Sequence, residues 1–292
     1  MRIGTRGSPL ALAQARWVAD RLGQDWELVT VTTSGDRGVG EEDKSRWVGE
    51  LEQALIRGEI DLAVHSAKDV PAASHDKLEL VAFPAREDAR DALCGAPSLA
   101  ALEWGARVGT SSVRRSAQLR ALREDLEVVN LRGNVDTRLR KLQEGAVDAI
   151  VVAVAGLVRL DRRAEVGATL DELVPAAGQG ALAIEARRGA APVRDLAAVS
   201  DGATTACVEA ERELVRLLDG SCRTPMGAHA RMLESGQLEL VAWVGLADGS
   251  EWIRDAVRGA AGQVAQDVGE RMLAAGAGEL LHRAALSAGS AG

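Results

Sequence analysis

Short apolar runs alternate with amphipathic segments along the first half of the chain, and turn residues separate them. Ser8, followed by proline, has the pattern of a helix N-cap. Strands are predicted over Arg2–Thr5 and Glu27–Thr33, and helices over Pro9–Leu22 and Val48–Arg57. This alternation predicts βαβ units and a mostly parallel sheet.

The next strand is predicted to start at Asp61 and to reach an adjacent Lys68 and Asp69, after which Pro71 stops it. A cation and a carboxylate at the carboxyl end of a buried strand lie where open α/β sheets bind ligands. Asp69 can serve there as an acid or base whose ionisation Lys68 helps to set. The alternative is a structural ion pair at the end of a strand.

The second part of the chain repeats this pattern. Arg107–Thr110 resembles Arg2–Thr5, and Val147–Val151 resembles Ile60–Val64. In each case a small polar loop and a helix follow the first strand, and a glycine precedes the second. The repeat predicts two similar α/β lobes with a cleft between them.

A different pattern begins near Asp201 and predicts a small antiparallel α+β domain. Turns are expected at Ser235-Gly236 and Asp248-Gly249, between alternating strands. The elements expected here are helices over Thr204–Leu218 and Gln263–Leu286 and strands over Ala228–Leu233, Leu238–Leu246 and Trp252–Val257, followed by a frayed tail over Ser287–Gly292.

Length and composition indicate a globular protein of two or three domains, with 292 residues that are 47% hydrophobic and 27% charged. The net charge of −8 argues against a nucleic-acid surface. No apolar run is long enough to span a bilayer, and the first residues are predicted to be a strand rather than a signal peptide. The expected location is the cytoplasm, without a membrane partner.

Cysteine and cation usage narrow the chemistry further. Cys94, Cys207 and Cys222 are far apart, so neither a disulfide framework nor a metal site is expected. Lysine occurs at only four positions, so arginine supplies the other 31 of the 35 cations. Because arginine is the better bidentate partner for carboxylate or phosphate, a local cluster would indicate a small anionic ligand.

Three segments place small polar residues and arginine at predicted helix starts: Thr5–Ser8, Gly109–Arg115 and Asn130–Arg138. Free backbone N–H groups and the helix dipole favour an anion at such positions. Each segment alone is also compatible with ordinary capping and a solvated arginine. None has the glycine spacing of a nucleotide-binding loop, so several carboxylates or phosphates are the expected ligand.

These motifs, taken together, resemble the porphobilinogen deaminase (hydroxymethylbilane synthase) family in order and over nearly the whole chain. The matching segments are Thr5–Ala11, His65–Pro71, Arg86–Ala92, Gly109–Arg115, Leu131–Leu139, Ala155–Leu160, Pro175–Ala181 and Gly220–Cys222. The chain departs from the family pattern at Ser45–Trp47, at Ala67 and at Arg223–Pro225. These departures remove no group that the mechanism needs.

The resemblance implies a dipyrromethane cofactor, bound through a thioether to Cys222, and no metal. Cys94 and Cys207 are expected to be structural. The implied catalytic residue is Asp69, and the implied cofactor-binding residues are Cys222, Lys68, Asp69, Thr110, Ser112, Arg114 and Arg115. The implied substrate-binding residues are Arg6, Ser8, Gln14, Lys44, Arg132, Arg138 and Arg159.

The resemblance also implies an activity and an architecture. The enzyme would be a monomer that condenses four porphobilinogen molecules with release of ammonia and then hydrolyses the chain to hydroxymethylbilane. Its fold would be α/β, with two lobes like type II periplasmic binding proteins and a small C-terminal α+β domain with an antiparallel sheet. The expected boundaries are 1–86 with 180–200, 87–179 and 201–292, and a lid is expected over 35–46.

Two other functions are compatible with part of the pattern. A non-catalytic, two-lobed binding protein for a small anion would use the same arginines but would need neither Asp69 nor a group on Cys222. A carboxylate-recognising transferase could use Cys222 as an acyl nucleophile, but no histidine neighbours it in a recognisable dyad motif.

Overall fold

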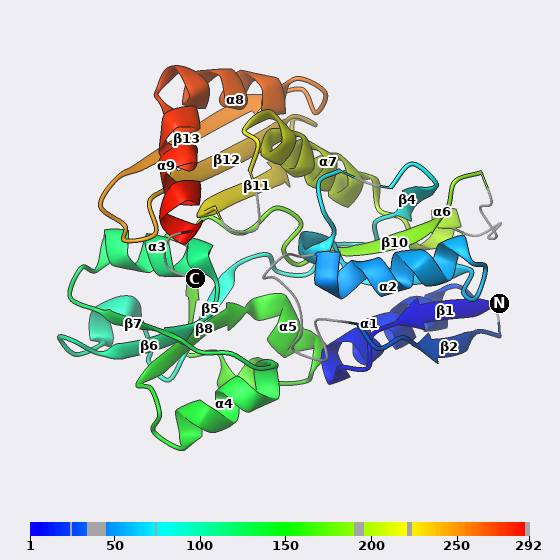
Figure 1. Ribbon diagram of the computed structural model, residues 1–292, viewed down its shortest axis with the longest axis horizontal. Helices are drawn as coiled ribbons and strands as arrows, with labels where there is room; N and C mark the ends of the chain where they lie inside the picture. Colours follow the sequence, from blue (N-terminus) through cyan, green and yellow to red (C-terminus); the bar gives the residue numbers. More distant parts are fainter. Residues whose placement is uncertain (24, 34–44, 74, 190–195, 221–223, 290–292) are drawn as a thin grey trace. The chain divides into compact units, whose positions relative to one another are not determined.

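The computed structural model describes residues 1–23, 25–33, 45–73, 75–189, 196–220 and 224–289. The chain divides into two compact units, Met1–Glu87 with Gly178–Glu209 and Asp88–Ala177 with Ala210–Gly292. Each unit contains a five-stranded sheet, and the second also contains a three-stranded antiparallel sheet (Figure 1). The α/β class with two sheet lobes and a small C-terminal sheet is confirmed, whereas the division into three domains and the cleft stay predictions.

The first sheet is mostly parallel, as predicted from the sequence, but it includes one reversed strand, β10 (Leu182–Arg187). Its order is β2 (Glu27–Thr30), β1 (Arg2–Thr5), β3 (Leu62–Ser66), β10 (Leu182–Arg187) and β4 (Leu78–Ala82). The first three strands are parallel, but β10 is antiparallel to both of its neighbours. A strand distant in sequence therefore completes the sheet beside β3.

Two helices cover opposite faces of this sheet. Helix α1 (Pro9–Arg21) packs Ala15 and Val18 against apolar side chains of one face, whereas α2 (Ser45–Ile56) packs on the other. The N-cap of α1 is confirmed, because the Ser8 hydroxyl accepts a hydrogen bond from the Ala11 N–H at 3.3 Å. This cap fixes where the loop after β1 turns into the helix.

The strand expected to carry Lys68 and Asp69 ends earlier, at Ser66. The pair lies instead in a short 3₁₀ turn, η1 (Ala67–Asp69), closed by a hydrogen bond from the Val70 N–H to the Ala67 carbonyl at 3.2 Å. Strand β2 also ends earlier than predicted, at Thr30. The turn carries Asp69 off the line of the strand.

The second sheet has the same plan as the first. Its order is β7 (Glu127–Asn130), β6 (Arg107–Thr110), β8 (Ala149–Ala153), β5 (Asp91–Cys94) and β9 (Ala168–Leu170), again with three parallel strands and then two antiparallel pairings. Helix α3 (Val113–Leu122) packs on one face, and α4 (Val135–Gln143) and α5 (Val154–Arg159) pack on the other. The sequence repeat thus corresponds to two similar sheets.

The C-terminal sheet consists of β11 (Met226–Met232), β12 (Leu238–Gly245) and β13 (Trp252–Gly259), after helix α7 (Gly202–Leu217). The single last helix predicted from the sequence is wrong: α8 (Val264–Ala274) and α9 (Ala277–Gly289) are separate helices. Gly276 lies between them with φ +98°, a conformation that ends α8 and that glycine adopts readily. The end of α9 also extends past the predicted boundary at Leu286.

The remaining short elements are η2 (Leu99–Ala101), η3 (Arg163–Glu165) and α6 (Leu196–Val199). Among the helices in the described part of the chain, none has the length and apolar character needed to cross a bilayer.

Candidate active site

A small cavity in the first unit brings together several of the predicted site residues. Its volume is about 50 Å³, and its polar lining comes from the loop after β1, from α1, from the end of β3 and from η1. These polar residues are Arg6, Ser8, Gln14, His65, Ser66 and Asp69. The cavity holds a few water molecules or one small polar group of a larger ligand.

The start of α1 forms one wall of this cavity and favours an anion. The Arg6 guanidinium donates a hydrogen bond to the Ser8 hydroxyl at 3.3 Å. The same hydroxyl caps α1, whose N-terminal N–H groups and dipole add partial positive charge. Arg6 and Ser8, two of the predicted substrate-binding residues, therefore lie together.

Gln14 is held in place by the residue that ends β3. It is buried on α1, and its Nε2 donates to the hydroxyl of Ser66 at 2.9 Å. Because Ser66 ends β3 and Asp69 follows in η1, this hydrogen bond ties the helix to the segment that carries the predicted catalytic carboxylate.

Asp69 is partly buried and lines the cavity. Among the described residues, its carboxylate has no hydrogen bond or ion pair to another side chain, so both oxygens can act on a ligand. Lys68, its neighbour in η1, is also partly buried. A carboxylate in a cavity that otherwise favours anions is suited to binding a cation and to moving protons.

The turn around Asp69 depends on a segment more than a hundred residues further along the chain. Gly178 has φ +73°, and a Cβ on it would lie 2.9 Å from the backbone nitrogen of Lys68. The Ala67 N–H donates to the carbonyl of Ala181 at 3.0 Å. The glycine motif Pro175–Ala181 thus supports η1, a role that the sequence pattern did not reveal.

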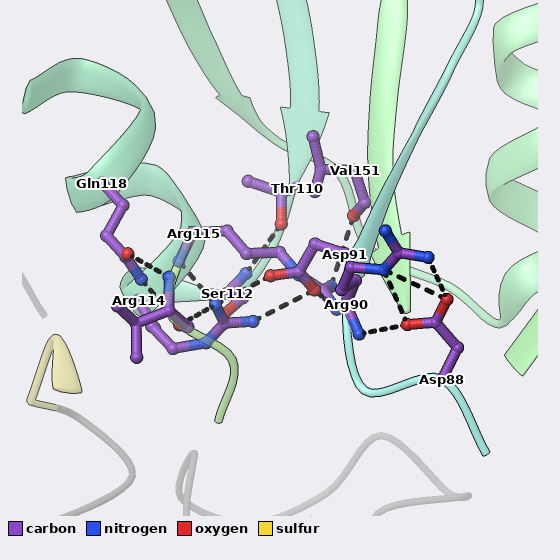
Figure 2. A network of polar contacts seen from close by, with 10 residues as sticks. Asp88, Arg90, Asp91, Thr110, Ser112, Arg114, Arg115, Gln118 and Val151 are labelled. Atoms are coloured by element: carbon purple, nitrogen blue, oxygen red, sulfur yellow. Dashed lines mark hydrogen bonds and ion pairs between the residues drawn. The ribbon is translucent and has the colours of Figure 1, made fainter. Parts of the chain in front are cut away.

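In the second unit, Arg114 and Arg115 on α3 share a single buried carboxylate (Figure 2). Arg114 Nη1 lies 2.8 Å from Asp91 Oδ2, and Arg115 Nη2 lies 2.8 Å from Asp91 Oδ1. All three side chains are buried, with Asp91 at 0% exposed. Burial lowers the pKa of Arg115, and repulsion from Arg114 opposes the stabilising effect of Asp91.

The start of α3 is ordered by its own hydroxyl groups. Ser112 is the N-cap and accepts from the Arg115 N–H at 3.4 Å, while the buried Thr110 hydroxyl accepts from the Ser112 N–H at 3.2 Å. These predicted cofactor-binding residues therefore lie together at one helix start, with Arg114 and Arg115 anchored by Asp91.

A third arginine adds to this positive charge. Arg138 on α4 donates from Nη2 to the Ser111 hydroxyl at 2.8 Å and from Nε to the Gly133 carbonyl at 2.8 Å. Burial, together with repulsion from Arg115, lowers the pKa of Arg138 to about 10. Arg138 thus lies near enough to Arg115 for their charges to repel each other, and a set of guanidinium donors of this kind fits a ligand with several carboxylates.

Four predicted site residues, Arg132, Arg159, Lys44 and Cys222, remain to be placed. Arg132 is exposed in the loop before α4, and Arg159 is the last residue of α5. Lys44 and Cys222 lie outside the described residues, as do positions 35–44 of the predicted lid. Cys94 and Cys207 are buried thiols outside any disulfide, and burial raises the pKa of Cys94 to about 12, as suits structural cysteines.

Sequence reasoning assigned no role to Asp91, His65 or Glu185. For Asp91, the sequence does hold a signal, because this charged residue starts the otherwise apolar run Asp91–Cys94. A carboxylate inside a buried strand needs a cationic partner, and Arg114 and Arg115 are those partners.

Comparison with known proteins agrees with this geometry. The family model "Porphobilinogen deaminase, dipyromethane cofactor binding domain" matches residues 1–195, and the model "Porphobilinogen deaminase, C-terminal domain" matches residues 205–274. The chain belongs to the porphobilinogen deaminase family. The resemblance, the enzyme class and the dipyrromethane cofactor predicted from the sequence are confirmed, and the non-catalytic alternative has no support.

Curated relatives in this family match almost end to end. The porphobilinogen deaminase of Deinococcus radiodurans is 45% identical over 96% of this chain and 97% of its own length. That of Deinococcus deserti is 47% identical over 86% of this chain and 87% of its own. That of Thermus thermophilus is 44% identical over 96% of this chain and 97% of its own.

Among solved structures, the chain is similar to Immunogenic lipoprotein A from Vibrio vulnificus, with a TM-score of 0.43, 16% identity and coverage of 68% of this chain and 92% of that one. It is also similar to a periplasmic substrate-binding protein of an ABC transporter from Coxiella burnetii, with a TM-score of 0.40, 16% identity and coverage of 70% and 94%.

The buried ion cluster at the start of α3 leads to a stability prediction. Asp91→Ala leaves two buried guanidiniums without their carboxylate, so we expect the free energy of unfolding to fall by about 3 to 5 kcal/mol. Chemical denaturation of the purified variant measures this loss.

The matched control is Glu251→Ala, which removes the partner of Arg283 in an exposed ion pair and should leave the transition nearly unchanged. A loss of less than about 1 kcal/mol for Asp91→Ala would contradict the view that Asp91 anchors both arginines.

Proposed function

We propose that this protein is a cytoplasmic, monomeric hydroxymethylbilane synthase in which Asp69 is the catalytic carboxylate and Cys222 carries the dipyrromethane cofactor. It would condense four porphobilinogen molecules with release of ammonia and hydrolyse the product to hydroxymethylbilane. The observation that supports this most strongly is the cavity that Asp69 lines together with Arg6, Ser8 and Gln14. The buried thiols of Cys94 and Cys207 are compatible with a reducing compartment. Neither nucleic acid nor a membrane is part of the proposed activity.

The arginines would recognise the carboxylates of the ligands. Each pyrrole unit carries an acetate and a propionate, so the ligand gains negative charge with every condensation. Charge-assisted hydrogen bonds to guanidinium groups are the strongest neutralising contacts that a protein offers. In this proposal the substrate is held by Arg6, Ser8, Gln14, Lys44, Arg132, Arg138 and Arg159.

The cofactor would be held by the thioether of Cys222 and by Lys68, Asp69, Thr110, Ser112, Arg114 and Arg115. When bound, dipyrromethane supplies the pyrrole carbon to which the first substrate is joined. The pair of Arg114 and Arg115 supports this role, because hydrogen bonds to Asp91 fix the orientation of both guanidiniums. Such a preformed site needs little rearrangement to bind a carboxylate.

Asp69 would act on the aminomethyl group of the substrate. Its carboxylate pairs with the ammonium as it binds, and then stabilises the cationic methylene carbon after the carbon–nitrogen bond breaks and ammonia leaves. It next accepts the proton that the attacked pyrrole carbon loses on coupling. One side chain thus serves as counter-ion and base, since the bound ammonium already carries the proton with which ammonia departs.

Substitution of Asp69 tests the catalytic assignment. In Asp69→Ala, we expect kcat to fall by about 10²- to 10⁴-fold, because the cationic state loses its counter-ion and the proton its acceptor. Binding of substrate-like dicarboxylates, measured by calorimetry, should persist because the arginines remain.

The control for this experiment is Asp76→Ala, which removes an exposed carboxylate of the same unit and should keep the activity of the unchanged protein. Normal turnover by Asp69→Ala would refute the role of Asp69.

Intact-protein mass spectrometry tests the cofactor assignment. The purified protein should be heavier than its sequence by two linked pyrrole units, and Cys222→Ala should lose this increase because the thioether cannot form. Cys94→Ala should keep it. An unmodified mass for the protein purified from cells that make porphobilinogen would contradict the proposal.

A further inference from the structure

A pair of buried titratable side chains lies at the wall of the Asp69 cavity, and neither member has a role in the mechanism above. His65 Nε2 and Glu185 Oε2 are 3.0 Å apart, at 5% and 0% exposed. His65 also lines the cavity that contains Asp69. The pair therefore connects the cavity with the interior of the first unit.

Strand pairing explains why these two side chains meet. Glu185 on β10 is the register partner of Ala63 on β3, so Glu185 and His65 project from the same face of the sheet. Helix α2 covers this face, since Ala63 belongs to the apolar cluster of Leu51 and Leu55. The pair thus lies in the layer between the sheet and α2.

Only one of the two carboxylate oxygens of Glu185 has a hydrogen-bond partner among the described residues. Its Oε1 is buried and has no hydrogen-bond partner among the described residues. A buried carboxylate is costly unless it is paired, and its hydrogen-bond partner in this structure is one imidazole, which can itself gain or lose a proton. A proton gained or lost by one of the two side chains therefore changes the hydrogen bond that the other can make.

A third titratable group lies on α2, the helix that covers this face of the sheet. Glu52 on α2 is partly buried, and its pKa is raised by burial and by the charge of Glu185. The charges of His65 and His75 act in the opposite direction. Glu52 thus responds to the charge on both members of the pair.

The proposed reaction creates a need for such groups. The aminomethyl group of the substrate has a basicity close to that of lysine, with a pKa of about 10, so it binds as an ammonium. When the carbon–nitrogen bond breaks, its electron pair leaves with ammonia. The new carbon–carbon bond then replaces a carbon–hydrogen bond of the attacked pyrrole, whose electron pair returns to the ring and whose proton passes to Asp69. Each condensation leaves one proton in the cavity, and Asp69 must lose it before it can act again.

We propose that His65, hydrogen-bonded to Glu185, is the second proton acceptor of the cavity, which takes the proton from Asp69 and passes it toward Glu52. This inference rests on the proposed function and on the role of Asp69 in it. The proton travels from an Asp69 oxygen, directly or through a water molecule of the cavity, to the His65 ring, which shares its Nε2 proton with Glu185. The charged groups that face this path are Arg6 and Asp69 in the cavity, Glu185 on β10 and Glu52 on α2, with His75 acting on Glu52.

Two isosteric variants of the complete, cofactor-loaded protein test the proposal. In His65→Gln and Glu185→Gln, we expect kcat to fall by about 10- to 100-fold with little change in KM, because proton removal slows while carboxylate binding is kept. Imidazole added at constant pH should restore part of the kcat of His65→Gln, since a diffusible base can take the proton instead. The intact mass should still include the cofactor.

A second readout does not depend on activity. The ring nitrogen signals of ¹⁵N-labelled histidine report the hydrogen bond of His65 by NMR. Glu185→Gln replaces the carboxylate at His65 Nε2 by a neutral amide, so the Nε2 signal should move. If His65→Gln does not fold, the kcat of Glu185→Gln and this NMR signal still test the proposal.

The control is His282→Gln, an exposed histidine on α9, which should keep the kcat and imidazole response of the unchanged protein. A kcat within about twofold of the unchanged protein for both variants, or a loss that imidazole does not relieve, would overturn the proposal. Failure of the proposed function is distinguishable, because then the unchanged protein itself would make no hydroxymethylbilane.

Discussion

Two guanidinium groups that share one buried carboxylate set the electrostatics of the second unit. Asp91 is fully buried at the start of β5 and holds both Arg114 and Arg115. The carboxylate makes their burial tolerable and fixes the orientation of both guanidiniums, and the pKa of Arg138 is lowered by burial and by the charge of Arg115. The fold therefore gathers oriented guanidinium groups of the kind that bind an anionic ligand. This constraint connects the packing of the sheet to the recognition of carboxylates.

In the first unit, the fold places one carboxylate, that of Asp69, in a cavity whose other polar groups favour anions. Asp69 is presented by a 3₁₀ turn rather than by a strand, and the turn is supported from outside by Gly178 and by the carbonyl of Ala181. A side chain at position 178 would collide with the backbone of that turn. The site thus depends on β10 and the loop before it, which return to this sheet only after the second sheet is complete.

The sequence predicted well those features that local chemistry decides. Ser8 caps α1, and the repeat of Arg2–Thr5 at Arg107–Thr110 corresponds to two similar sheets. Prediction from the sequence failed for features that depend on contacts between distant segments of the chain. The antiparallel insertion of β10 beside β3 depends on pairing across more than a hundred residues, and no periodicity near Leu62 reveals it. The break at Gly276 was missed because apolar positions continue on both sides of it.

In the candidate site, too, local features were predictable from the sequence and contacts between distant segments were not. Arginines at helix starts were recognisable as anion ligands, but their shared partner Asp91 was not, because strand pairing brings it to α3. His65 and Glu185 likewise meet only through the register of β3 and β10.

In the proposed function, arginines at the helix starts select the ligand through its carboxylates. Comparing kcat/KM for porphobilinogen and for its dimethyl ester on the complete enzyme tests this recognition. We expect a loss of at least about 100-fold for the ester, because its neutral side chains cannot replace charge-assisted hydrogen bonds to arginine. Similar values of kcat/KM for the two compounds would contradict it.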